Sequence, residues 1–574
     1  MITRLATIVL LSSFATAQTN LPVSVSSAGA LANKDSYYSL ISTDGRYVVF
    51  QSEASNLVLN DFNNRYDIFR RDLQTGVTDL VSVGTSGSSA FGLGLSPAVS
   101  GDGRYVAWSS DASNLITGDT NGTWDVFLRD MQAGLTTRIS LTGGGGQAPL
   151  RSDQPRMSPD ARFITFESDA DLIVSDTNGL KDCYRLDRNT GQLDLVSTSS
   201  TGALGNSISY AAQPSNDGRY VCFFSSASNL VSGDTNAWAD VFRKDMLTGT
   251  QLRVNVSSAG VQANNESIWP SISGDGETVT YCSVASNLVA GDSNGQFDVF
   301  ARDIQAGVTT RLNVQPNGAQ ANSYVHSPTA LSTDGRFVIF ASLSSNLVPG
   351  DTNGFQDSFI RDRLLQVTER VGFAFDGSQA NSDSFVPHMT PDVRVITFTS
   401  VASNIVLGDT NGLRDIFATN RGGSFSVYCT AKLNSLSCTP SIGAVGSPSA
   451  TNSFPFVVSA SQVRNQKSGL MMYTPNGAQS ALPFQGGTLC IAPSGLKRTP
   501  ASSSGGNPLP VNDCSGVFSL DFNAFGAGLL GGNPSAALSI PGNTYQCQAW
   551  GRDPGFPAPN NTTLSDALDV VIGP

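Results

Sequence analysis

One unit of about 58 residues repeats seven times along the first three quarters of the chain, and this period constrains the fold more than any other feature. Each copy is marked by an aspartate and a turn residue before an apolar strand: Asp44-Gly45, Asp102-Gly103, Asp160-Ala161, Asp217-Gly218, Asp275-Gly276, Asp334-Gly335 and Asp392-Val393. The second residues of successive pairs lie 58, 58, 57, 58, 59 and 58 positions apart. Such a period indicates an array of identical supersecondary units. No unit can bury its apolar surface alone, so each packs that surface against its neighbours.

Each unit is predicted to contain four short β-strands. In the second copy these are residues 97–100, 104–109, 124–130 and 135–141. The Asp-Gly pair joins the first two strands as a hairpin turn. The second strand is apolar on both faces, as in residues 47–50, and therefore requires a sheet that is covered on both sides. Four-stranded sheets packed around an axis meet that requirement, so the sequence predicts an all-β fold with a seven-bladed β-propeller.

The seventh copy lacks a fourth strand, and the N-terminal region supplies a matching segment. The copy stops after its third strand, at residues 415–417, whereas residues 21–33 match residues 252–264 at nine of thirteen positions. The second of these segments is a fourth strand with its exit loop. We therefore expect residues 21–27 to complete the seventh blade and close the ring, which protects strand edges that an open array would expose.

The composition fits a turn-rich β protein and argues against polyanionic partners. Of the 46 acidic residues, 41 are Asp, which favours turns, and five are Glu, which favours helices. The net charge is −12, and no run of Lys or Arg occurs. Nucleic acid and anionic membrane surfaces are therefore poor partners, and a monomer is expected.

The first 17 residues have the pattern of a secretory signal peptide. Arg4 supplies the positive charge, residues 5–14 form an apolar core, and Ala15-Thr16-Ala17 is a small-residue cleavage site. Later in the sequence no stretch approaches the ~20 apolar residues that a spanning helix requires. We expect secretion to the exterior, the cell surface or the periplasm, without a membrane span.

Beyond the repeats, Gly, Pro, Ser and Asn dominate a region of different character. The predicted domains are the signal peptide at 1–17, the propeller at 18–424 and a β-rich domain at 425–574. Short strand-like runs separated by turn clusters predict a smaller β-sandwich-like domain in this last region. A flexible tail is the alternative, although the aromatic residues and cysteines there favour a packed core.

The eight cysteines divide between the two regions. Cys183, Cys222 and Cys282 each occur in a single repeat and are predicted to be buried apolar residues. The other five lie in the last 150 residues, as in disulfide-stabilised exported domains: Cys429, Cys438, Cys490, Cys514 and Cys547. The preferred pairs are Cys429 with Cys438 and Cys490 with Cys514, and at least one cysteine of the five remains outside them.

The repeat resembles a known family. The pattern D-G-R-Y-V-x-F-x-S followed by D-V-F-x-R-D is similar to the TolB-type, WD-like propeller repeat of bacterial exported proteins, over residues 21 to about 420. The stretches G-G-N-P and W-G-R-D-P-G-F-P of the C-terminal region resemble an uncharacterised module that follows such repeats. The resemblance implies a binding propeller rather than a catalytic one, and it supplies no active-site residues.

A polar motif in the long connection between the second and third strands is the main candidate site. An Asp, an Asn two residues later and an Asp six residues later occur in every copy: Asp61/Asn63/Asp67, Asp119/Asn121/Asp125, Asp176/Asn178/Asp182, Asp234/Asn236/Asp240, Asp292/Asn294/Asp298, Asp351/Asn353/Asp357 and Asp409/Asn411/Asp415. An Asn or Asp five residues before the first member, such as Asn114, adds a fourth oxygen side chain. Alternating oxygen ligands are typical of Ca²⁺ loops. Asx turns that cap the loop's own N–H groups are the favoured alternative, since such polar turns often need no metal.

Catalytic signatures are sparse, and three functions remain open. His326 and His388 stand at non-equivalent positions and are interpreted as capped loop residues, and no G-x-S-x-G motif or phosphate loop occurs. The favoured function is a non-catalytic scaffold that binds a protein or a polysaccharide through the propeller loops. A polysaccharide lyase or glycoside hydrolase acting over the channel is the first alternative. A structural envelope component is the second.

Overall fold

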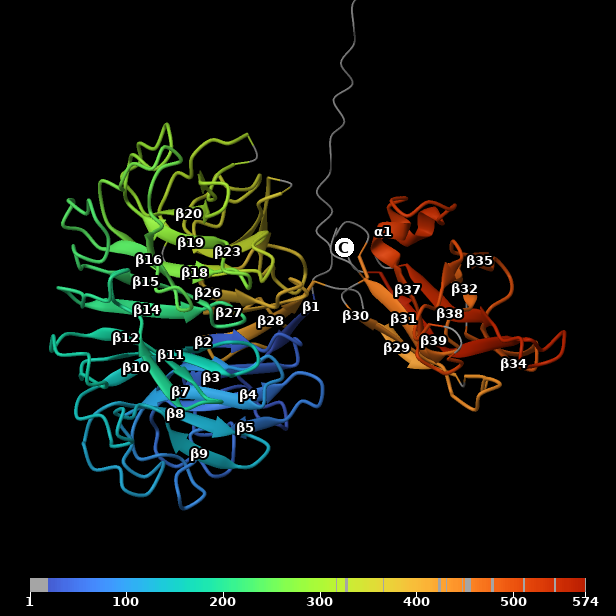
Figure 1. Ribbon diagram of the computed structural model, residues 1–574, viewed down its shortest axis with the longest axis horizontal. Coiled ribbons are helices and arrows are strands. Elements are labelled where there is room, and N and C mark those ends of the chain that lie inside the picture. The colour runs from blue at the N-terminus through green and yellow to red at the C-terminus, as the bar shows by residue number, and fades with distance from the viewer. Residues whose placement is uncertain are drawn as a thin grey trace, which may run out of the picture. The chain divides into compact units, whose positions relative to one another are not determined.

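The chain forms two compact units, one ending at Asn420 and the other beginning at Arg421 (Figure 1). The computed structural model describes residues 19–574 apart from 316, 326–328, 365, 422–424, 430, 446–447, 450–455, 476–478, 509–510, 541–542 and 573–574. The proposed signal peptide and His326 lie outside the described residues. The predicted division at residues 424/425 falls a few positions beyond the observed one.

The first unit consists of seven four-stranded antiparallel sheets, which we number in chain order of their first strands. Sheets one to three contain β2 (Ser36–Ile41), β3 (Tyr47–Ser52), β4 (Asp67–Asp72), β5 (Thr78–Leu80); β6 (Gly94–Val99), β7 (Tyr105–Ser110), β8 (Asp125–Asp130), β9 (Leu135–Arg138); and β10 (Ser152–Met157), β11 (Phe163–Ser168), β12 (Asp182–Asp187), β13 (Gln192–Leu195). Sheets four to six contain β14 (Ser209–Pro214), β15 (Tyr220–Ser225), β16 (Asp240–Asp245), β17 (Gln251–Arg253); β18 (Ser267–Ile272), β19 (Thr278–Ser283), β20 (Asp298–Asp303), β21 (Val308–Arg311); and β22 (Ala330–Leu331), β23 (Phe337–Ser342), β24 (Asp357–Asp362), β25 (Val367–Val371). Sheet seven contains β26 (Ser384–Met389), β27 (Val395–Ser400), β28 (Asp415–Asn420) and β1 (Thr19–Pro22). The predicted all-β propeller fold is confirmed.

The N-terminal strand β1 occupies the fourth position of sheet seven. It pairs antiparallel with β28, and Leu21 lies opposite Ala418, three residues after the strand-initial Asp415. Leu252 lies opposite Arg243, three residues after Asp240, so the matching segment of sheet four has the same register. The prediction placed this strand at residues 21–27. The observed strand begins two residues earlier, at Thr19, and is shorter, since it ends at Pro22. Strand β2 packs against β26 and β27, next to this sheet.

One aromatic pair stabilises the interior of every sheet. A ring on the second strand packs on a ring of the third strand with centroids 5.6 to 6.0 Å apart: Phe50–Phe69, Trp108–Phe127, Phe166–Tyr184, Phe223–Phe242, Tyr281–Phe300, Phe340–Phe359 and Phe398–Phe417. The second strands are buried on both faces, as Val48, Val49 and Phe50 illustrate. Directly opposed aromatic rings are among the most stabilising cross-strand pairs, which explains why the repeat retains them.

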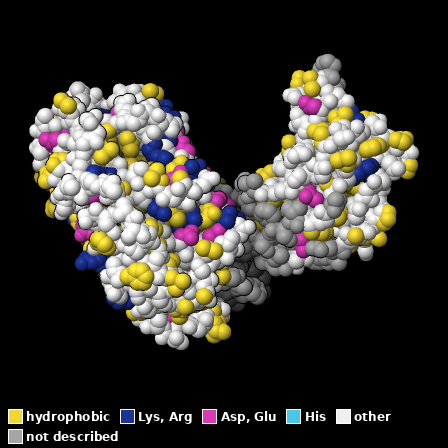
Figure 2. All heavy atoms as spheres, turned by 90° about the horizontal axis from the view of Figure 1, so that it is seen from below, with side chains coloured by type: hydrophobic (Ala, Val, Ile, Leu, Met, Phe, Trp, Pro, Cys, Tyr) yellow, Lys and Arg dark blue, Asp and Glu magenta, His cyan; other side chains and the backbone are white. Residues whose placement is uncertain are grey.

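The D-G-R and R-D parts of the repeat form an ion pair at one end of the sheet. Arg46, just after the Asp44-Gly45 turn, donates to both carboxylate oxygens of Asp72 at the end of β4, at 2.7 to 3.1 Å. Sheets two, three, four and six repeat this contact with Arg104–Asp130, Arg162–Asp187, Arg219–Asp245 and Arg336–Asp362. Bidentate pairing fixes both turns at this end. Figure 2 shows Lys or Arg side chains next to Asp or Glu side chains on the surface of the propeller.

The second unit is a β-sandwich. One sheet is formed by β29 (Phe425–Tyr428), β39 (Thr562–Val571), β38 (Thr544–Arg552), β32 (Ser468–Pro475), β35 (Lys497–Arg498) and β36 (Ser502–Ser503). The other contains β30 (Ser441–Val445), β31 (Val457–Val463) and β37 (Gly516–Asp521). A separate hairpin of β33 (Gln479–Phe484) and β34 (Gly487–Ile491) packs against β38 and β39 of the first sheet. Side chains of both sheets share one core, for example Val458, Phe518, Tyr473 and Leu568. A short helix, α1 (Phe522–Gly526), adds Phe525 to that core.

The predicted disulfide pairing is wrong, although the predicted set of cysteines is right. Cys429 pairs with Cys490 and Cys438 with Cys514, and their Cα atoms lie 6.1 and 6.5 Å apart. Each bridge joins segments that are distant in sequence, so spacing along the chain could not indicate the partners. Cys547 is buried and belongs to neither disulfide, and the propeller cysteines Cys183, Cys222 and Cys282 are buried outside any disulfide of the described structure. Two disulfides in one small unit are typical of an exported protein. Within the described chain, no helix has the length and apolar character needed to cross a membrane.

Candidate functional site

The Asp-x-Asn motifs lie in seven equivalent loops at one end of the sheets. We number each loop as its sheet; they span residues 53–66, 111–124, 169–181, 226–239, 284–297, 343–356 and 401–414. The connection that leaves each fourth strand lies beside the loop of the same sheet. Asn63 Nδ2, for example, donates to the carbonyl of Ala90 at 2.6 Å, and Asn236 Nδ2 donates to that of Ala263 at 2.8 Å. We call this side of the propeller the loop face.

The central Asn has the same structural role in all seven loops. Its Oδ1 accepts the N–H two residues later, at 2.8 to 3.2 Å, from Arg65, Thr123, Leu180, Trp238, Gln296, Phe355 and Leu413. Its Nδ2 donates to the second Asp of the motif, for example from Asn63 to Asp67 at 2.7 Å. These are Asx turns, which is the geometry that the capping interpretation expects.

This role differs from that of the oxygen ligand that the Ca²⁺ interpretation assigned to each central Asn. Asn121, Asn294 and Asn353 direct Nδ2, a donor, toward Asp125, Asp298 and Asp357, at 2.9, 3.2 and 3.0 Å. Their Oδ1 atoms are engaged by the N–H groups of their own turns. Asn63, Asn178, Asn236 and Asn411 have the same orientation. An amide oriented in this way donates to the carboxylates, while its oxygen lies on the side of its own turn.

The second Asp of the motif begins the third strand and is buried in every sheet. Asp67, Asp125, Asp182, Asp240, Asp298, Asp357 and Asp415 are all at most 1 % exposed. Six of them accept a further hydrogen bond from a side chain two residues beyond the end of the fourth strand: Ser82, Ser140, Ser197, Asn255, Asn313 and Ser24. Burial raises the pKa of Asp67 to about 7 and that of Asp182 to about 6. A charged carboxylate in this position therefore requires a partner.

In four sheets an arginine of the fourth strand supplies that partner. Arg138, Arg253, Arg311 and Arg370 each place Nη1 between the two carboxylates of their loop, 3.2 to 3.5 Å from both. Their side chains are only 8 to 12 % exposed. We call loops two, four, five and six the bridged loops.

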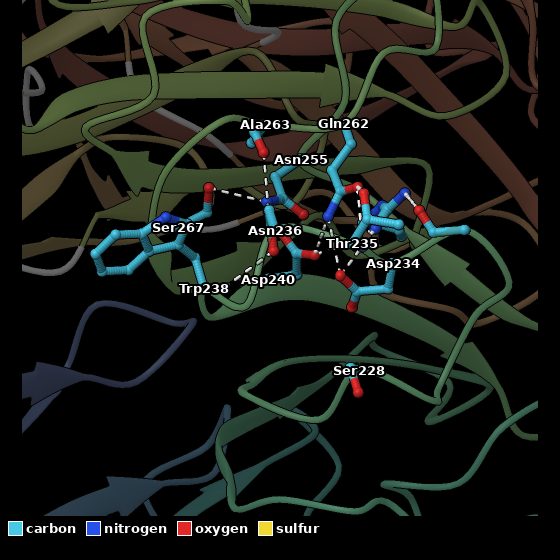
Figure 3. Close-up of polar contacts among 12 residues, drawn as sticks. Ser228, Asp234, Thr235, Asn236, Trp238, Asp240, Asn255, Gln262, Ala263 and Ser267 are labelled. Carbon is cyan, nitrogen blue, oxygen red and sulfur yellow. Dashed lines mark hydrogen bonds and ion pairs between the residues drawn. The ribbon is translucent and has the colours of Figure 1, made fainter.

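A glutamine accompanies each bridging arginine. In loop four, Gln262 Nε2 donates to Asp234 at 2.9 Å, and its Oε1 accepts the N–H of Thr235 at 3.3 Å. In loop five the Oε1 of Gln320 also accepts from Arg311 at 2.9 Å. Figure 3 shows Asp234, Asn236, Asp240 and Gln262 directed toward one another. The four glutamines are Gln147, Gln262, Gln320 and Gln379.

Loops one, three and seven have neither residue, and we call them the unbridged loops. The positions equivalent to the arginine hold Leu80, Leu195 and Pro22, and those equivalent to the glutamine hold Ser89, Leu204 and Leu31. In each unbridged loop one oxygen of the first Asp is buried and accepts no hydrogen bond within the described structure: Asp61 Oδ2, Asp176 Oδ1 and Asp409 Oδ1. These residues are 4, 3 and 8 % exposed. Among the described residues no Lys or Arg pairs with them.

In the six loops where the expected fourth oxygen ligand is an Asn, that Asn contacts the preceding connection instead of the carboxylates. Asn114 Oδ1 accepts the N–H of Phe91, which lies in the connection that leaves sheet one, at 2.8 Å. Asn229 likewise clamps the preceding connection, where its Oδ1 accepts from Asn206 and its Nδ2 donates to Leu204. The Asn at this position therefore ties neighbouring sheets together, whereas Asp171 of loop three accepts the N–H of Gly179 in its own loop at 3.1 Å.

The described residues contain no group of three or more His, Cys, Asp and Glu side chains that could hold a metal ion. Any cation at a loop would therefore be held by two carboxylates together with carbonyl or water oxygens. In the bridged loops an arginine forms an ion pair with the first Asp, which is Asp119, Asp234, Asp292 or Asp351. In the unbridged loops the first Asp has no such partner within the described structure: Asp61, Asp176 and Asp409. The structure thus brings all predicted Asp and Asn residues together, loop by loop, in two different electrostatic settings.

A signal for the bridging residues was present in the sequence. Segments 21–33 and 252–264 differ at four positions, and two of these replace Arg253 by Pro22 and Gln262 by Leu31. Every bridged sheet has an Arg followed nine residues later by a Gln, as in Arg138 and Gln147. These residues lie outside the loop, so inspection of the loop motif alone could not find them.

A second charged cluster occurs only in sheet three. Lys181 Nζ lies 3.3 Å from Asp153, 3.5 Å from Glu167 and 3.6 Å from Asp169. Glu167 accepts the N–H of Ala211 in sheet four at 2.6 Å. The equivalent residue of sheet two, Ser109, accepts the N–H of Gln154 in sheet three. Burial and the neighbouring Asp153 raise the pKa of Glu167 to about 7. Its side chain is only 3 % exposed, so the cluster supports the joint between two sheets.

His388 is not the capped loop residue that was predicted. It lies in β26, the first strand of sheet seven, and its ring is edge-on to Tyr38 with centroids 5.9 Å apart. Arg156 of β10 donates to the Tyr38 hydroxyl. Burial and the charge of Arg156 lower the pKa of His388 to about 4. First strands of sheets one, three and seven thus meet through these three side chains, which the repeat pattern could not reveal because each is unique to its copy.

Comparisons with known proteins give matches among solved structures. Neither a family model nor a curated protein matches the sequence. Among solved structures it is similar to TolB from Acinetobacter baumannii, with 19 % identity, a TM-score of 0.30, and coverage of 48 % of this chain and 54 % of that one. It is also similar to the β-propeller domain of the Trilobed protease from Pyrococcus furiosus, with 11 % identity, a TM-score of 0.43, and coverage of 68 % and 94 %. The oligogalacturonate lyase of Vibrio parahaemolyticus matches with 11 % identity, a TM-score of 0.41, and coverage of 68 % and 90 %. The match spans about half the length of the Acinetobacter protein, and these likenesses concern the fold alone.

Proposed function

We propose that this protein is an exported, non-catalytic binding scaffold whose propeller presents the loop face to a protein or polysaccharide ligand. The two disulfides support export. The rigid sheets position loops of nearly equal length around one end, which is the usual arrangement of a binding surface on a β scaffold.

The distribution of exposed aromatic side chains carries this proposal. Of the residues that the structure describes, the five highly exposed Phe and Trp side chains all belong to the loop face: Phe62, Phe91, Trp238, Phe355 and Phe375. Their exposed fractions run from 38 to 73 %. Large, rigid aromatic side chains that remain exposed on one face are typical anchors for a macromolecular ligand.

The opposite end of the same sheets has a different surface. Its exposed apolar side chains are aliphatic, for example Leu247 and Leu364 in the turns between third and fourth strands. Five of its arginines are paired with aspartates, as in Arg46–Asp72. The exposed aromatic side chains distinguish the loop face and make it the better candidate for recognition.

The experiment compares two double variants in the full chain. Trp238→Ala/Phe355→Ala removes aromatic anchors from loops four and six, whereas Leu247→Ala/Leu364→Ala removes exposed apolar side chains from the opposite ends of the same two sheets. Binding is measured on an array of plant, algal and bacterial polysaccharides and on a panel of envelope proteins. We expect the first variant to lose at least tenfold in affinity for whatever the unaltered protein retains. Equal loss in both variants, or in neither, contradicts a binding site on the loop face.

The catalytic alternative is tested in the same screen. The only singular titratable cluster described above, around Glu167 and Lys181, is buried and engaged in a joint between sheets. We therefore expect retention of a polysaccharide without new reducing ends or unsaturated products. Turnover that disappears on substitution of Asp153 or Glu167 favours the lyase or hydrolase.

A further inference from the structure

We propose that the unbridged loops one, three and seven are cation sites that take Ca²⁺ between the two carboxylates of each loop, and that in the bridged loops an arginine occupies the equivalent position. The protein would then bind three divalent ions, although its Asp-x-Asn motif occurs seven times. This inference stands independently of the ligand proposed for the loop face.

The bridged loops show where positive charge is required. In each of them a guanidinium nitrogen lies within 3.5 Å of both carboxylates, in a setting that is almost closed to solvent. Two buried carboxylates without a cation would be strongly disfavoured, because desolvation and mutual repulsion act together. Four of the seven copies thus supply the cation from the chain itself.

The unbridged loops keep the same carboxylates and lose the cation. Their Asx turns and strand-initial aspartates are unchanged, as the bonds of Asn63 to Asp67, Asn178 to Asp182 and Asn411 to Asp415 show, at 2.7 to 2.8 Å. One oxygen in each, such as Asp61 Oδ2, is buried and lacks a hydrogen-bond donor in the described structure. A buried, unpartnered carboxylate oxygen that recurs at one position in three loops points to a ligand.

Arginine and glutamine are lost together, which supports one cause. In the bridged loops Gln379 accepts from Arg370 at 3.0 Å and also accepts the N–H of Thr352 at 3.1 Å. The glutamine thus belongs to the arginine network. In loops three and seven a leucine, Leu204 or Leu31, replaces the glutamine. These loops therefore lack both the arginine charge and the glutamine that binds the arginine.

The donor set suits a hard divalent cation. Carboxylate oxygens, backbone carbonyls and water are the ligands that Ca²⁺ prefers, and its flexible geometry tolerates loops that differ in detail. Loop three adds Asp171, whose charge acts on both Asp176 and Asp182, and the Tyr184 hydroxyl, which donates to Asp176. A proton shared between the carboxylates is the competing way to remove the excess charge.

Equilibrium dialysis of the full chain with Ca²⁺ tests the proposal. The buffer contains about 0.15 M NaCl, because the net charge of −12 attracts cations diffusely and salt screens that attraction. The unaltered protein is expected to bind three Ca²⁺ ions. Leu195→Arg/Leu204→Gln gives loop three the bridging pair, and both replaced side chains are only partly buried. This variant is expected to bind two ions.

Two further variants complete the set. Arg253→Leu/Gln262→Leu converts loop four to the unbridged type and is expected to bind four ions. Leu252→Arg adds the same charge on the exposed side of β17 and is expected to leave the number at three. Binding of no ion or of seven ions by the unaltered protein overturns the proposal, and no binding favours the shared proton. An unchanged number in the Leu195→Arg/Leu204→Gln variant also overturns it, even if Arg253→Leu/Gln262→Leu does not fold.

Discussion

The bridged and unbridged loops have the same Asx turn and the same two carboxylates. They differ in what balances the negative charge of those carboxylates. Loop four closes around Asp234 and Asp240 with Arg253 and Gln262, whereas loop three holds Asp176 and Asp182 without either residue. The comparison shows that the Asp-x-Asn motif alone determines the turn, through its Asn. Residues of the neighbouring fourth strand determine the electrostatics.

The two kinds of loop also differ at their tips. Two residues before the first Asp, the unbridged loops carry Leu59, Val174 and Leu407, which are 97, 98 and 82 % exposed. The bridged loops carry Thr117, Ser232, Ala290 and Pro349 at this position. An exposed aliphatic tip beside a proposed cation site suggests that the three unbridged loops take part in recognition as a set.

The largest effect on stability is expected in sheet seven, which combines the N-terminal strand β1 with the last three strands of the propeller. Deleting residues 19–25 removes β1, the buried Val23 and Val25, and Ser24, whose hydroxyl donates to Asp415 at 2.6 Å. We expect a loss on the order of 5 kcal/mol in the unfolding free energy of the propeller, measured by urea denaturation. Leu21→Ala, which alters a partly exposed side chain of the same strand, is the control and should cost less than about 1 kcal/mol. An undiminished midpoint after the deletion contradicts a ring completed by the N-terminal strand.

The next effect concerns the arginine of a bridged loop. Arg253→Met leaves Asp234 and Asp240 buried without their cation and should destabilise the protein by about 3 to 5 kcal/mol. Leu195→Met is the matched substitution in an unbridged loop and should cost less than about 1.5 kcal/mol. Chemical denaturation in chelator measures both. Similar losses in the two variants would remove the distinction between the two kinds of loop.

A pH-dependent effect is expected in the third sheet, where Lys181, the last residue of unbridged loop three, faces Asp153, Glu167 and Asp169. The pKa of Glu167, raised from 4.5 to about 7, means that folding favours its uncharged form. The resulting stability is fully present below pH 4.5 and is lost as the pH rises through 7. Glu167→Gln keeps an oxygen for the Ala211 N–H and should be more stable than the unaltered protein above about pH 7, by at most about 3 kcal/mol. Parallel stability curves from about pH 4.5 to about pH 8 would refute this account.

The smallest effect on stability is expected at the tips. Leu59→Ser, Val174→Ser and Leu407→Ser remove almost fully exposed side chains and should each change the unfolding free energy by less than about 0.5 kcal/mol. Their triple variant should nevertheless weaken ligand retention by the loop face. Thr117→Ala/Ser232→Ala is the control from the bridged loops. Retention that responds equally to both variants would show that the tips do not distinguish the loops.

The fold could be predicted because the same sequence pattern for one four-stranded sheet occurs seven times in the chain. The Asp-turn pairs, the apolar second strand and the match between residues 21–33 and 252–264 each predict the sheets and the place of β1. The Asx turns followed from the loop motif in the same way. Features that repetition does not carry were missed: the disulfide partners, and the meeting of Tyr38, Arg156 and His388.

The candidate site was predicted only in part, for a physical reason. The loop motif places two carboxylates together, but their charge state depends on a residue that follows the second Asp by 13 positions, as Arg138 follows Asp125. The β-hairpin between third and fourth strands brings this residue back to the loop. A pattern confined to the loop therefore treats all seven copies as equal, although three of them lack the bridging arginine.

Anomalous diffraction from crystals soaked in Tb³⁺, a Ca²⁺ substitute with a strong anomalous signal, tests the division of the loops most directly. The account predicts peaks beside Asp61, Asp176 and Asp409, and none beside Asp119, Asp234, Asp292 and Asp351, where an arginine lies between the carboxylates. Peaks at the bridged loops, or a lack of peaks at all three unbridged loops, would contradict it.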